Sequence, residues 1–441
     1  MINYQKWFQK SKLQGLDGLE IVIYEERKFN INLEDGHIEQ FTANYLTSYL
    51  IYGLFKNKKN SIYLEKIDDL NDDVVIDKIL KRLKEKIRIL NFHEQDFLFS
   101  GSPQYNTIKE DNFNFDSIPC DHKIKLLQKF YQQLLVSQYF TKKCNLLYSE
   151  IFWCQKIVNS LGLKLQQCNS YALLEVNCIF GNNQIQKEVD KSFPVKKFED
   201  FELSMYVENI LTLGENQIGA KTLPSKFYRV VFSNEVFSEL LSNFQNIFSA
   251  LYVYRNLSKY QHSQGKLVAN PKVTIIDDPF ISTAFFNPIF DDEGVACQAK
   301  HIITKGILNN FIHNLQTAKI FNVLPEGNSF NGSISMSNCY LKSGNKSLPE
   351  LLYAVKNGIY VNSIVGCHAG IDEISGSFSL QASGFCIKNG FIKNPFNMVV
   401  ISGNFFDLLN NIQDIANDFK FQISGFGSSS VYVGFLNISG S

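Results

Sequence analysis

The residue types that could do chemistry are densest in one glycine-rich stretch near the end of the sequence. Residues 366–390, GCHAGIDEISGSFSLQASGFCIKNG, contain one histidine, two carboxylates, four serines and five glycines. His368, Asp372 and a nearby serine are the side-chain types of a catalytic triad, but triad members normally converge from separate elements. Four residues of irregular chain rarely place an aspartate behind a histidine and a serine in front of it. We therefore do not expect a serine-hydrolase site here.

The glycines of this stretch favour a surface shaped to admit a ligand. Glycine removes a Cβ atom where another backbone could approach or where the chain needs a positive φ. An aromatic residue alternates with two serines, which is typical of a strand with one polar face, and an extended peptide could add to the edge of such a strand. A buried strand with tight turns and no ligand is the alternative. The predicted substrate-cleft residues are Gly366, His368, Gly370, Gly376, Ser377, Phe378 and Ser379.

Motifs for metal binding, for phosphate binding and for an exposed nucleophilic serine are absent from the sequence. There is no GxxxxGK[ST] and no GxSxG, and the nearest pair of the seven histidines, 301 and 313, is too widely spaced to share a helical turn. His93, in NFHEQDF, has no second histidine to complete a zinc motif. The acidic pairs in TIIDDP and FDDEGV could hold Ca²⁺ or Mg²⁺, but they are also common turn sequences, and turns are the favoured interpretation.

Composition argues against several classes of protein. Lys+Arg and Asp+Glu both number 43, so no global field attracts nucleic acid or an anionic membrane. No apolar run is long enough for a membrane span, and the N-terminus lacks the apolar core of a signal peptide, so we expect a cytoplasmic protein. The nine cysteines include no CxxC, which predicts reduced, mostly buried thiols rather than a zinc ribbon or a disulfide framework.

Apolar periodicity predicts a mixed α/β first half. Strand-like alternation over residues 20–65 flanks Asp35-Gly36, the strongest short signal for a β-hairpin. Apolar residues at three- and four-residue steps predict helices over 70–90 and 122–140. Strand-like sequence returns over 145–193.

The domain boundary is predicted just after a third helical segment at 198–213. Residues 214–226, GENQIGAKTLPSK, lack apolar periodicity and contain a proline, so they are the best linker candidate. The boundary that we choose gives domains of residues 1–222 and 223–441.

The second half is predicted to be mostly sheet. It opens with a strand at 228–232 and a long helix at 234–254. Short apolar runs separated by glycine, asparagine and aspartate follow, with further helices only near 347–357 and 404–418. The expected fold is therefore α+β: an N-terminal mixed α/β domain, then a mostly β, barrel-like C-terminal domain with a few helices.

The second half also resembles the TldD/PmbA family of metallopeptidases. The resemblance rests on segments in the family's order, covering about residues 225–441, whereas the first half matches only in layout. These segments are PSKFYRVVFSNEVFSELLSNF, LSKYQHSQGKLV, TIIDDP, FDDEGVACQAKHIITKGILNNFIHNLQTAK, the stretch 366–390 and ISGNFFDLLNNIQDIANDF.

Two departures from the family pattern point to its PmbA branch, also called TldE. The TldD branch carries HExxxH on a helix, and that motif would fall near residues 241–246, which here read LSNFQN. The C-terminal loop ISGFGSSSVYVG has serines where that branch has a cysteine. The resemblance implies a chain that holds no metal and pairs with a TldD-type subunit carrying zinc or another divalent metal.

The function predicted from this resemblance is the non-metal subunit of a cytosolic metallopeptidase that acts on peptides and unfolded segments. A heterodimer is expected, a homodimer without the partner is also allowed, and neither nucleic acid nor membrane is an expected ligand. One alternative is a self-sufficient peptidase whose ligands are dispersed histidines, such as His262, His301 and His368. Another is a non-catalytic regulatory or binding protein, as the family's older name, modulator of DNA gyrase, implies.

Overall fold

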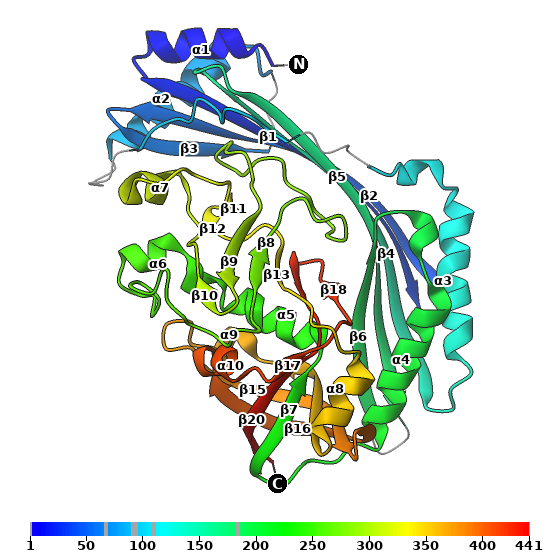
Figure 1. Cartoon of the computed structure of the whole chain (residues 1–441). Helices are drawn as coiled ribbons and strands as arrows, with labels where there is room; N and C mark the ends of the chain where they lie inside the picture. The colour runs from blue at the N-terminus through cyan, green and yellow to red at the C-terminus, as the bar shows by residue number, and fades with distance from the viewer. Residues whose placement is uncertain (1, 66–68, 90–95, 107–111, 182–185, 441) are drawn as a thin grey trace.

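A long, curved antiparallel sheet forms most of the first half of the chain. The computed structural model describes residues 2–65, 69–89, 96–106, 112–181 and 186–440. The sheet has the strand order β3-β2-β1-β4-β5-β6, and Figure 1 shows it arching over the second half of the chain. The β1–β2 turn lies at Asp35-Gly36, so the predicted hairpin is confirmed. The strands are β1 (Gly18–Glu34), β2 (His37–Phe55), β3 (Lys58–Leu64), β4 (Phe140–Asn159), β5 (Lys164–Gly181) and β6 (Gln186–Val195).

Helices cover the outer face of this sheet at its two ends. At one end, Trp7 and Ile76 pack with Ile21, and at the other, Phe130 and Ile210 belong to a second buried cluster. The predicted helix at 70–90 is confirmed as α2. The helix predicted at 122–140 is present as α3, but it ends at Leu134 and β4 begins at Phe140. His93 lies outside the described residues. These elements are α1 (Tyr4–Leu13), α2 (Asp73–Arg88), η1 (Phe115–Ser117), α3 (Cys120–Leu134), η2 (Phe198–Asp200) and α4 (Leu203–Ile218).

The second half, here called the C-terminal lobe, is built around a closed barrel. Strands β16-β15-β14-β7-β20 follow one another, and pairing of β16 with β20 closes the ring. The largest apolar cluster of the described residues fills it, with alternate residues such as Phe378 and Leu380 pointing inward. The barrel strands are β7 (Lys226–Phe232), β14 (Gly358–Val365), β15 (Ser377–Lys388), β16 (Phe391–Asn404) and β20 (Val431–Ser439), with β17 (Asp414–Ile415) added to β20.

A second six-stranded sheet of the lobe, ordered β10-β9-β8-β13-β19-β18, lies between the barrel and the long sheet (Figure 1). The chain is thus α+β, with a barrel in its β-rich C-terminal half, as predicted. The remaining strands are β8 (Ile275–Asp277), β9 (Lys300–Thr304), β10 (Ile307–Leu308), β11 (Ser329–Phe330), β12 (Ser333–Ile334), β13 (Cys339–Leu341), β18 (Lys420–Phe421) and β19 (Phe426–Ser428). The helices are α5 (Asn234–Asn243), η3 (Gln245–Phe248), α6 (Ala250–Tyr254), α7 (Leu315–Phe321), α8 (Leu348–Val355), α9 (Cys367–Gly370) and α10 (Phe405–Asn411).

Three further predicted helices, besides the one at 122–140, have the wrong extent. The helix expected at 234–254 is interrupted, because Ser249 is extended and residues 248 and 250 exchange backbone hydrogen bonds with Ile312. The helix expected to stop before Gly214 continues to Ile218, since Gly214 packs against Phe180 where a Cβ would clash. The helix expected at 404–418 ends at Asn411, and residues 414–415 pair with β20 instead.

The cysteine prediction is also wrong at one pair. Cys154 and Cys168 stand directly opposite each other on β4 and β5, with Cα atoms 4.1 Å apart, and form a disulfide. Their separation of 14 residues in sequence carries no signal of this pairing, which follows from the register of two long antiparallel strands. The other seven cysteines are free thiols, as expected.

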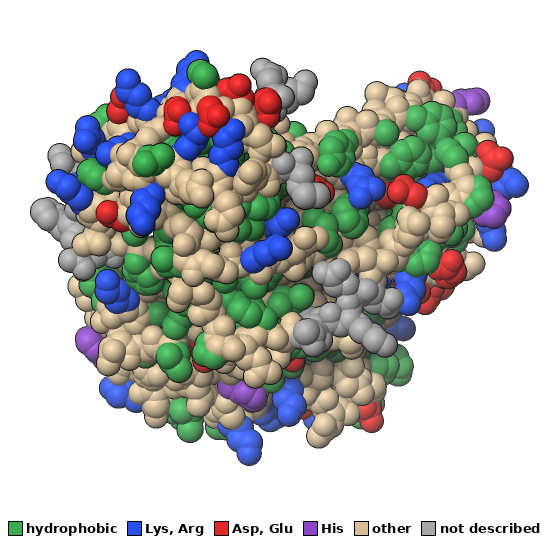
Figure 2. Space-filling view, turned by 90° about the horizontal axis from the view of Figure 1, so that it is seen from above, with side chains coloured by type: hydrophobic (Ala, Val, Ile, Leu, Met, Phe, Trp, Pro, Cys, Tyr) green, Lys and Arg blue, Asp and Glu red, His purple; other side chains and the backbone are tan. Residues whose placement is uncertain are grey.

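The surface of the molecule carries charges of both signs. Positive and negative side chains are scattered over the face seen from above, and the end of the sheet carrying α3 and α4 stands out from the body (Figure 2). Within the described ranges, every helix is too short or too polar to span a lipid bilayer. The division at residues 222 and 223 stays a prediction; one small apolar cluster, containing Val22, Ile157, Leu163 and Phe290, draws on both halves.

Candidate functional site

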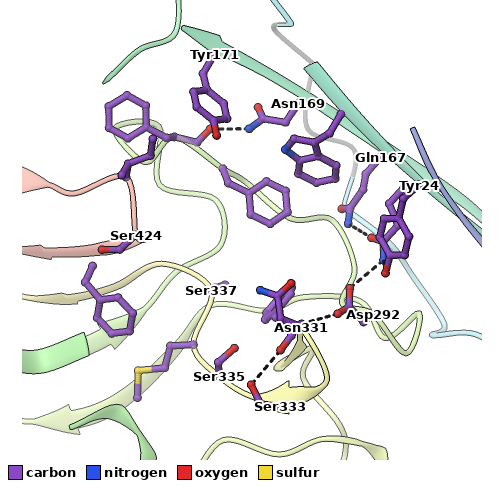
Figure 3. Close-up of a pocket in the computed structure, with 18 of the residues that line it drawn as sticks. Tyr24, Gln167, Asn169, Tyr171, Asp292, Asn331, Ser333, Ser335, Ser337 and Ser424 are labelled. Atoms are coloured by element: carbon purple, nitrogen blue, oxygen red, sulfur yellow. Dashed lines mark hydrogen bonds between the residues drawn. The ribbon is translucent and has the colours of Figure 1, made fainter. Parts of the chain in front are cut away.

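A cleft of about 620 Å³ lies between the inner face of the long sheet and the C-terminal lobe. Strands β1, β4 and β5 form one wall of this interlobe cleft. The other wall comes from residues 285–292 and 330–337, from Ser242 and Gln245, and from the segment 423–426. In Figure 3 the labelled sheet residues Tyr24, Gln167, Asn169 and Tyr171 lie across the space from Ser335, Ser337 and Ser424.

Side-chain amides fix the sheet wall to the lobe. Gln155 Nε2 donates to Asp292 Oδ1 at 2.9 Å and to Tyr24 Oη at 3.0 Å. Gln167 Nε2 donates to Gln155 Oε1 at 2.8 Å and to the carbonyl oxygen of Phe290 at 3.0 Å. Both glutamines are buried, so these bonds replace water and fix the position of the 285–292 loop.

Burial governs the ionisation of the polar groups in this network. It raises the pKa of Asp292, while the hydrogen bond from Gln155 and the backbone N–H of Asn331 lower it. Burial also raises the pKa of the Tyr24 phenol, and the neighbouring Asp292 charge adds to the effect. Tyr24 is therefore a neutral hydrogen-bonding group at physiological pH.

A buried aspartate organises the lobe wall. Asp277 Oδ1 accepts from the backbone N–H and the hydroxyl of Ser337, at 2.9 and 2.7 Å, and from the N–H of Asn338 at 3.0 Å. Its Oδ2 accepts from Asn328 Nδ2 at 2.8 Å and lies 3.6 Å from the Nζ of buried Lys300. These contacts hold residues 335–338 against the cleft.

One aspartate of each acidic pair caps a turn. Asp291 accepts backbone hydrogen bonds from Glu293, Val295 and Ser329, and Asp278 accepts one from Phe280 two residues ahead. Both patterns are those of aspartates that cap their own turns. The interpretation as turns is confirmed for Asp278 and Asp291, whereas Asp277 lies in β8 beside Lys300 and Asp292 accepts from Gln155 across the cleft.

Two segments singled out by the resemblance, LSNFQN and the C-terminal loop, each contribute to the interlobe cleft. Ser242 and Gln245, from LSNFQN, line it together with Ile423 and Ser424 of the C-terminal loop. Gln245 Oε1 accepts the backbone N–H of Met336 at 3.1 Å, which ties α5–η3 to the opposite loop. Both segments that the resemblance singles out therefore contribute side chains to this cleft.

The residues in place there do not fit a zinc ion. Zinc in proteins is held by thiolate, imidazole and carboxylate groups, whereas Ser242, Gln245 and Ser424 present neutral hydroxyl and amide groups. The carboxylate of Asp292 is already engaged by Gln155 and by the backbone of Asn331. Among the described residues, no three His, Cys, Asp or Glu side chains form a group that could hold a metal ion, and His262, His301 and His368 therefore do not converge.

The glycine-rich stretch 366–390 lies elsewhere, on α9 and β15, and none of its residues lines the interlobe cleft. Both edges of β15 are occupied, by β14 and β16 along the strand and by residues 371–372 near Ser377 and Phe378. Neither edge is therefore free for an added peptide, which was one of the two alternatives for this stretch. Whether the remaining surface of Gly366, Gly370, Ser379 and their neighbours receives a substrate stays a prediction.

Local contacts in this stretch explain its unusual composition. Gly376 has φ +79°, and a Cβ there would lie 2.4 Å from Phe406 Cδ2. Asp372 accepts from the hydroxyl of Ser375, which is the leading cause of the lowered pKa of that carboxyl. His368 is exposed and makes no hydrogen bond to Asp372 that the structure records, so the side chains do not form a triad.

The stretch contacts the segment that carries part of the cleft wall. Glu373 Oε2 accepts from Asn246 Nδ2 at 2.7 Å and from Tyr252 Oη at 3.4 Å. The thiol of Cys367 donates to Glu239 Oε1 at 3.3 Å. Residues 366–376 therefore support α5–η3, whose Ser242 and Gln245 face the cleft.

Sequence reasoning missed the sheet wall of the cleft completely. Tyr24, Trp153, Gln155, Gln167 and Asn169 are far apart in sequence and meet only through strand register. The one available signal was the unusual run of amides in KLQQCNS, residues 164–170, within an otherwise apolar strand.

Comparison with known proteins agrees with this architecture. Residues 225–440 match the family model described as the PmbA/TldA metallopeptidase C-terminal domain. A metalloprotease of Methanocaldococcus jannaschii is 24% identical over 440 residues, covering 94% of this chain and 95% of that one. A metalloprotease PmbA homolog of Buchnera aphidicola from Acyrthosiphon pisum is 26% identical, covering 91% and 88%. The chain belongs to the PmbA/TldD family of metallopeptidases.

Solved structures share the whole fold. A putative modulator of DNA gyrase from Thermotoga maritima matches with a TM-score of 0.90 and 27% identity, over 99% of each chain. TldE from Thermococcus kodakarensis matches with a TM-score of 0.86 over 99% of this chain and 100% of that chain. The latter is 17% identical and so shows the fold alone.

Proposed function

We propose that this chain is the TldE/PmbA-like, non-metal subunit of a cytosolic metallopeptidase, and that it binds peptide in the interlobe cleft. In this proposal a TldD-type partner subunit holds zinc or another divalent metal, which would activate water and polarise the scissile carbonyl. This chain contributes peptide binding and the contacts of the heterodimer. Without the partner it is inactive.

The observation that carries the proposal is that two segments without the metal ligands of the TldD branch both line one cleft. The segments 241–246 and 423–426 are distant in sequence, yet both line the space between the sheet and the lobe. Each lacks the metal ligands of the TldD branch, as a subunit that keeps the binding surface without the metal chemistry would. The cleft retains amides, hydroxyls and aromatic rings, which suit the backbone and side chains of an extended peptide.

The test is reconstitution with a purified TldD-type subunit. Each chain is assayed alone and in an equimolar mixture for cleavage of an unfolded peptide, with and without a chelator, and the mixture is analysed by sedimentation. We expect no stoichiometric metal and no turnover for this chain alone, and chelator-sensitive turnover with a 1:1 complex for the mixture. A mixture that neither associates nor cleaves would refute the proposed role.

A matched pair of variants links the activity to the cleft. Ser242→Trp would place a large side chain in the interlobe cleft, whereas the same change at Ser363 lies on the exposed face of β14, outside both the cleft and the predicted substrate residues. We expect the Ser242 variant to lose peptide affinity at least tenfold while still forming the complex. Equal loss in both variants would show that the cleft is not the binding site.

A further inference from the structure

The interlobe cleft has an unbalanced charge. Its described lining includes the carboxylates Glu25, Glu26 and Asp292, and no lysine, arginine or histidine. Asp292 is bonded to Gln155 and to the backbone of Asn331, so it is committed to the wall. The remaining carboxylates of the lining are the two glutamates, which are neighbours on β1.

Strand alternation sends these two side chains to opposite faces of the sheet. Tyr24 faces the lobe, because its hydroxyl accepts from Gln155, which also reaches Asp292. Successive side chains of a strand alternate, so Glu26 shares this inner face and Glu25 does not. The charge of Glu25 accordingly acts on Tyr49, which packs with the outer apolar cluster. Of the carboxylates in the described lining, Glu26 is the one that the sheet directs toward the cleft.

Two aromatic side chains of the sheet wall lie near Glu26, and its negative charge has no paired cation in the part of the chain that the structure describes. Its cross-strand partner on β4 is Trp153, whose ring centroid lies 4.9 Å from that of Phe286 in an edge-to-face contact. Tyr171 is a second polar ring near this carboxylate. Burial raises the pKa of its phenol, and the charges of Glu26 and Glu175 add to the effect. No ion pair or hydrogen bond to the Glu26 carboxylate is recorded among the described residues.

We infer that Glu26 makes the interlobe cleft selective for peptides that carry a basic group, which it pairs with while Trp153 and Tyr171 flank the cation. This inference rests on the proposed peptide-binding function and adds the class of substrate. A carboxylate beside electron-rich ring faces attracts lysine and arginine by both ion pairing and cation–π interaction. The shared chemistry is an ammonium or guanidinium group, from a side chain or from a free peptide N-terminus.

The experiment measures binding of short synthetic peptides to the purified full-length chain by isothermal titration calorimetry. The probes are octapeptides of glycine, serine and alanine, N-acetylated and C-amidated, with one central lysine, glutamine or glutamate. A glutamine peptide with a free N-terminus separates the two sources of positive charge. The variants are Glu26→Gln and Glu26→Lys, and Glu34→Gln on the same strand, outside the cleft, is the matched control.

The wild-type chain should bind the lysine peptide about fivefold to tenfold more tightly than the glutamine peptide, and the glutamate peptide least tightly. Glu26→Gln should remove this preference, Glu26→Lys should reverse it, and Glu34→Gln should keep it. A preference confined to the free N-terminus and lost with Glu26→Gln would assign the cation to the chain end. Equal binding of all peptides, or a lysine preference that survives Glu26→Gln, would overturn the inference while leaving peptide binding intact. If no peptide binds, the proposed function itself fails.

Discussion

Replacement of Gln167 by leucine tests whether hydrogen bonds between the sheet and the lobe position the cleft. The side chain is buried, and its amide reaches both halves of the molecule. Nε2 donates to Gln155 and to the carbonyl oxygen of Phe290, while Oε1 accepts from the backbone N–H of Ile289 at 2.9 Å. Leucine has a similar volume, so the change removes the bonds without opening a large cavity.

The expected loss of stability follows from the polar groups that Gln167→Leu leaves without hydrogen-bond partners. The side-chain oxygen of Gln155, the carbonyl of Phe290 and the N–H of Ile289 each lose a hydrogen bond, and an unsatisfied buried polar group costs roughly 1–3 kcal/mol. The added apolar contact of leucine and water entering from the cleft recover part of this cost. We expect a net loss of about 3 kcal/mol in the free energy of unfolding, a large share of the stability of a domain.

Denaturant unfolding followed by circular dichroism measures this loss, and calorimetric peptide binding measures its effect on the cleft. Gln166→Leu is the matched control, because Gln166 is exposed and its neighbouring contact is a weak one to Cys168 at 3.8 Å. The control should change stability by less than about 0.5 kcal/mol. A Gln167→Leu chain as stable as the control, with unchanged peptide affinity, would refute the role assigned to this amide.

Three other predictions follow from local contacts. Gly376→Ala should destabilise the chain by about 1–3 kcal/mol in chemical denaturation, because a positive φ and contact with Phe406 both oppose a Cβ; wild-type stability would contradict this. Asp277→Asn should cost about 3 kcal/mol, since it leaves buried Lys300 without its carboxylate, and full recovery of stability in a double variant with Lys300→Met would support that cause. Burial lowers the pKa of His313 to about 4, so the unfolded chain binds a proton below pH 6.5 that the folded chain does not. Stability should therefore fall by up to about 3 kcal/mol as the pH drops from 6.5 toward 4, and His313→Gln should lessen this fall; identical pH profiles would exclude His313 as its source.

The architecture was accessible from sequence because its signals are local. The Asp35-Gly36 hairpin and the amphipathic patterns of α2 and α3 depend on residues within one or two turns of each other. Where long-range contacts determine the backbone conformation, prediction from local apolar periodicity was wrong. The pattern at 234–254 is that of one helix, yet backbone pairing with Ile312 interrupts it.

The candidate site was less accessible, because it consists of residues that strand register brings together. Gln155 and Gln167 are paired across β4 and β5, and Asp292 joins them from the other half of the chain. Nothing in the spacing of these three residues indicates a common site. The resemblance supplied two segments that sequence chemistry alone would have passed over, LSNFQN and ISGFGSSSVYVG, because the informative feature of each is the set of residues that it lacks.

The glycine-rich stretch and the cleft are connected through the helical segment between them. Glu373 binds Asn246, one residue beyond Gln245, and the thiol of Cys367 binds Glu239 on the preceding helix. The dense polar composition of residues 366–376 is thereby accounted for by turn capping and by support of α5–η3.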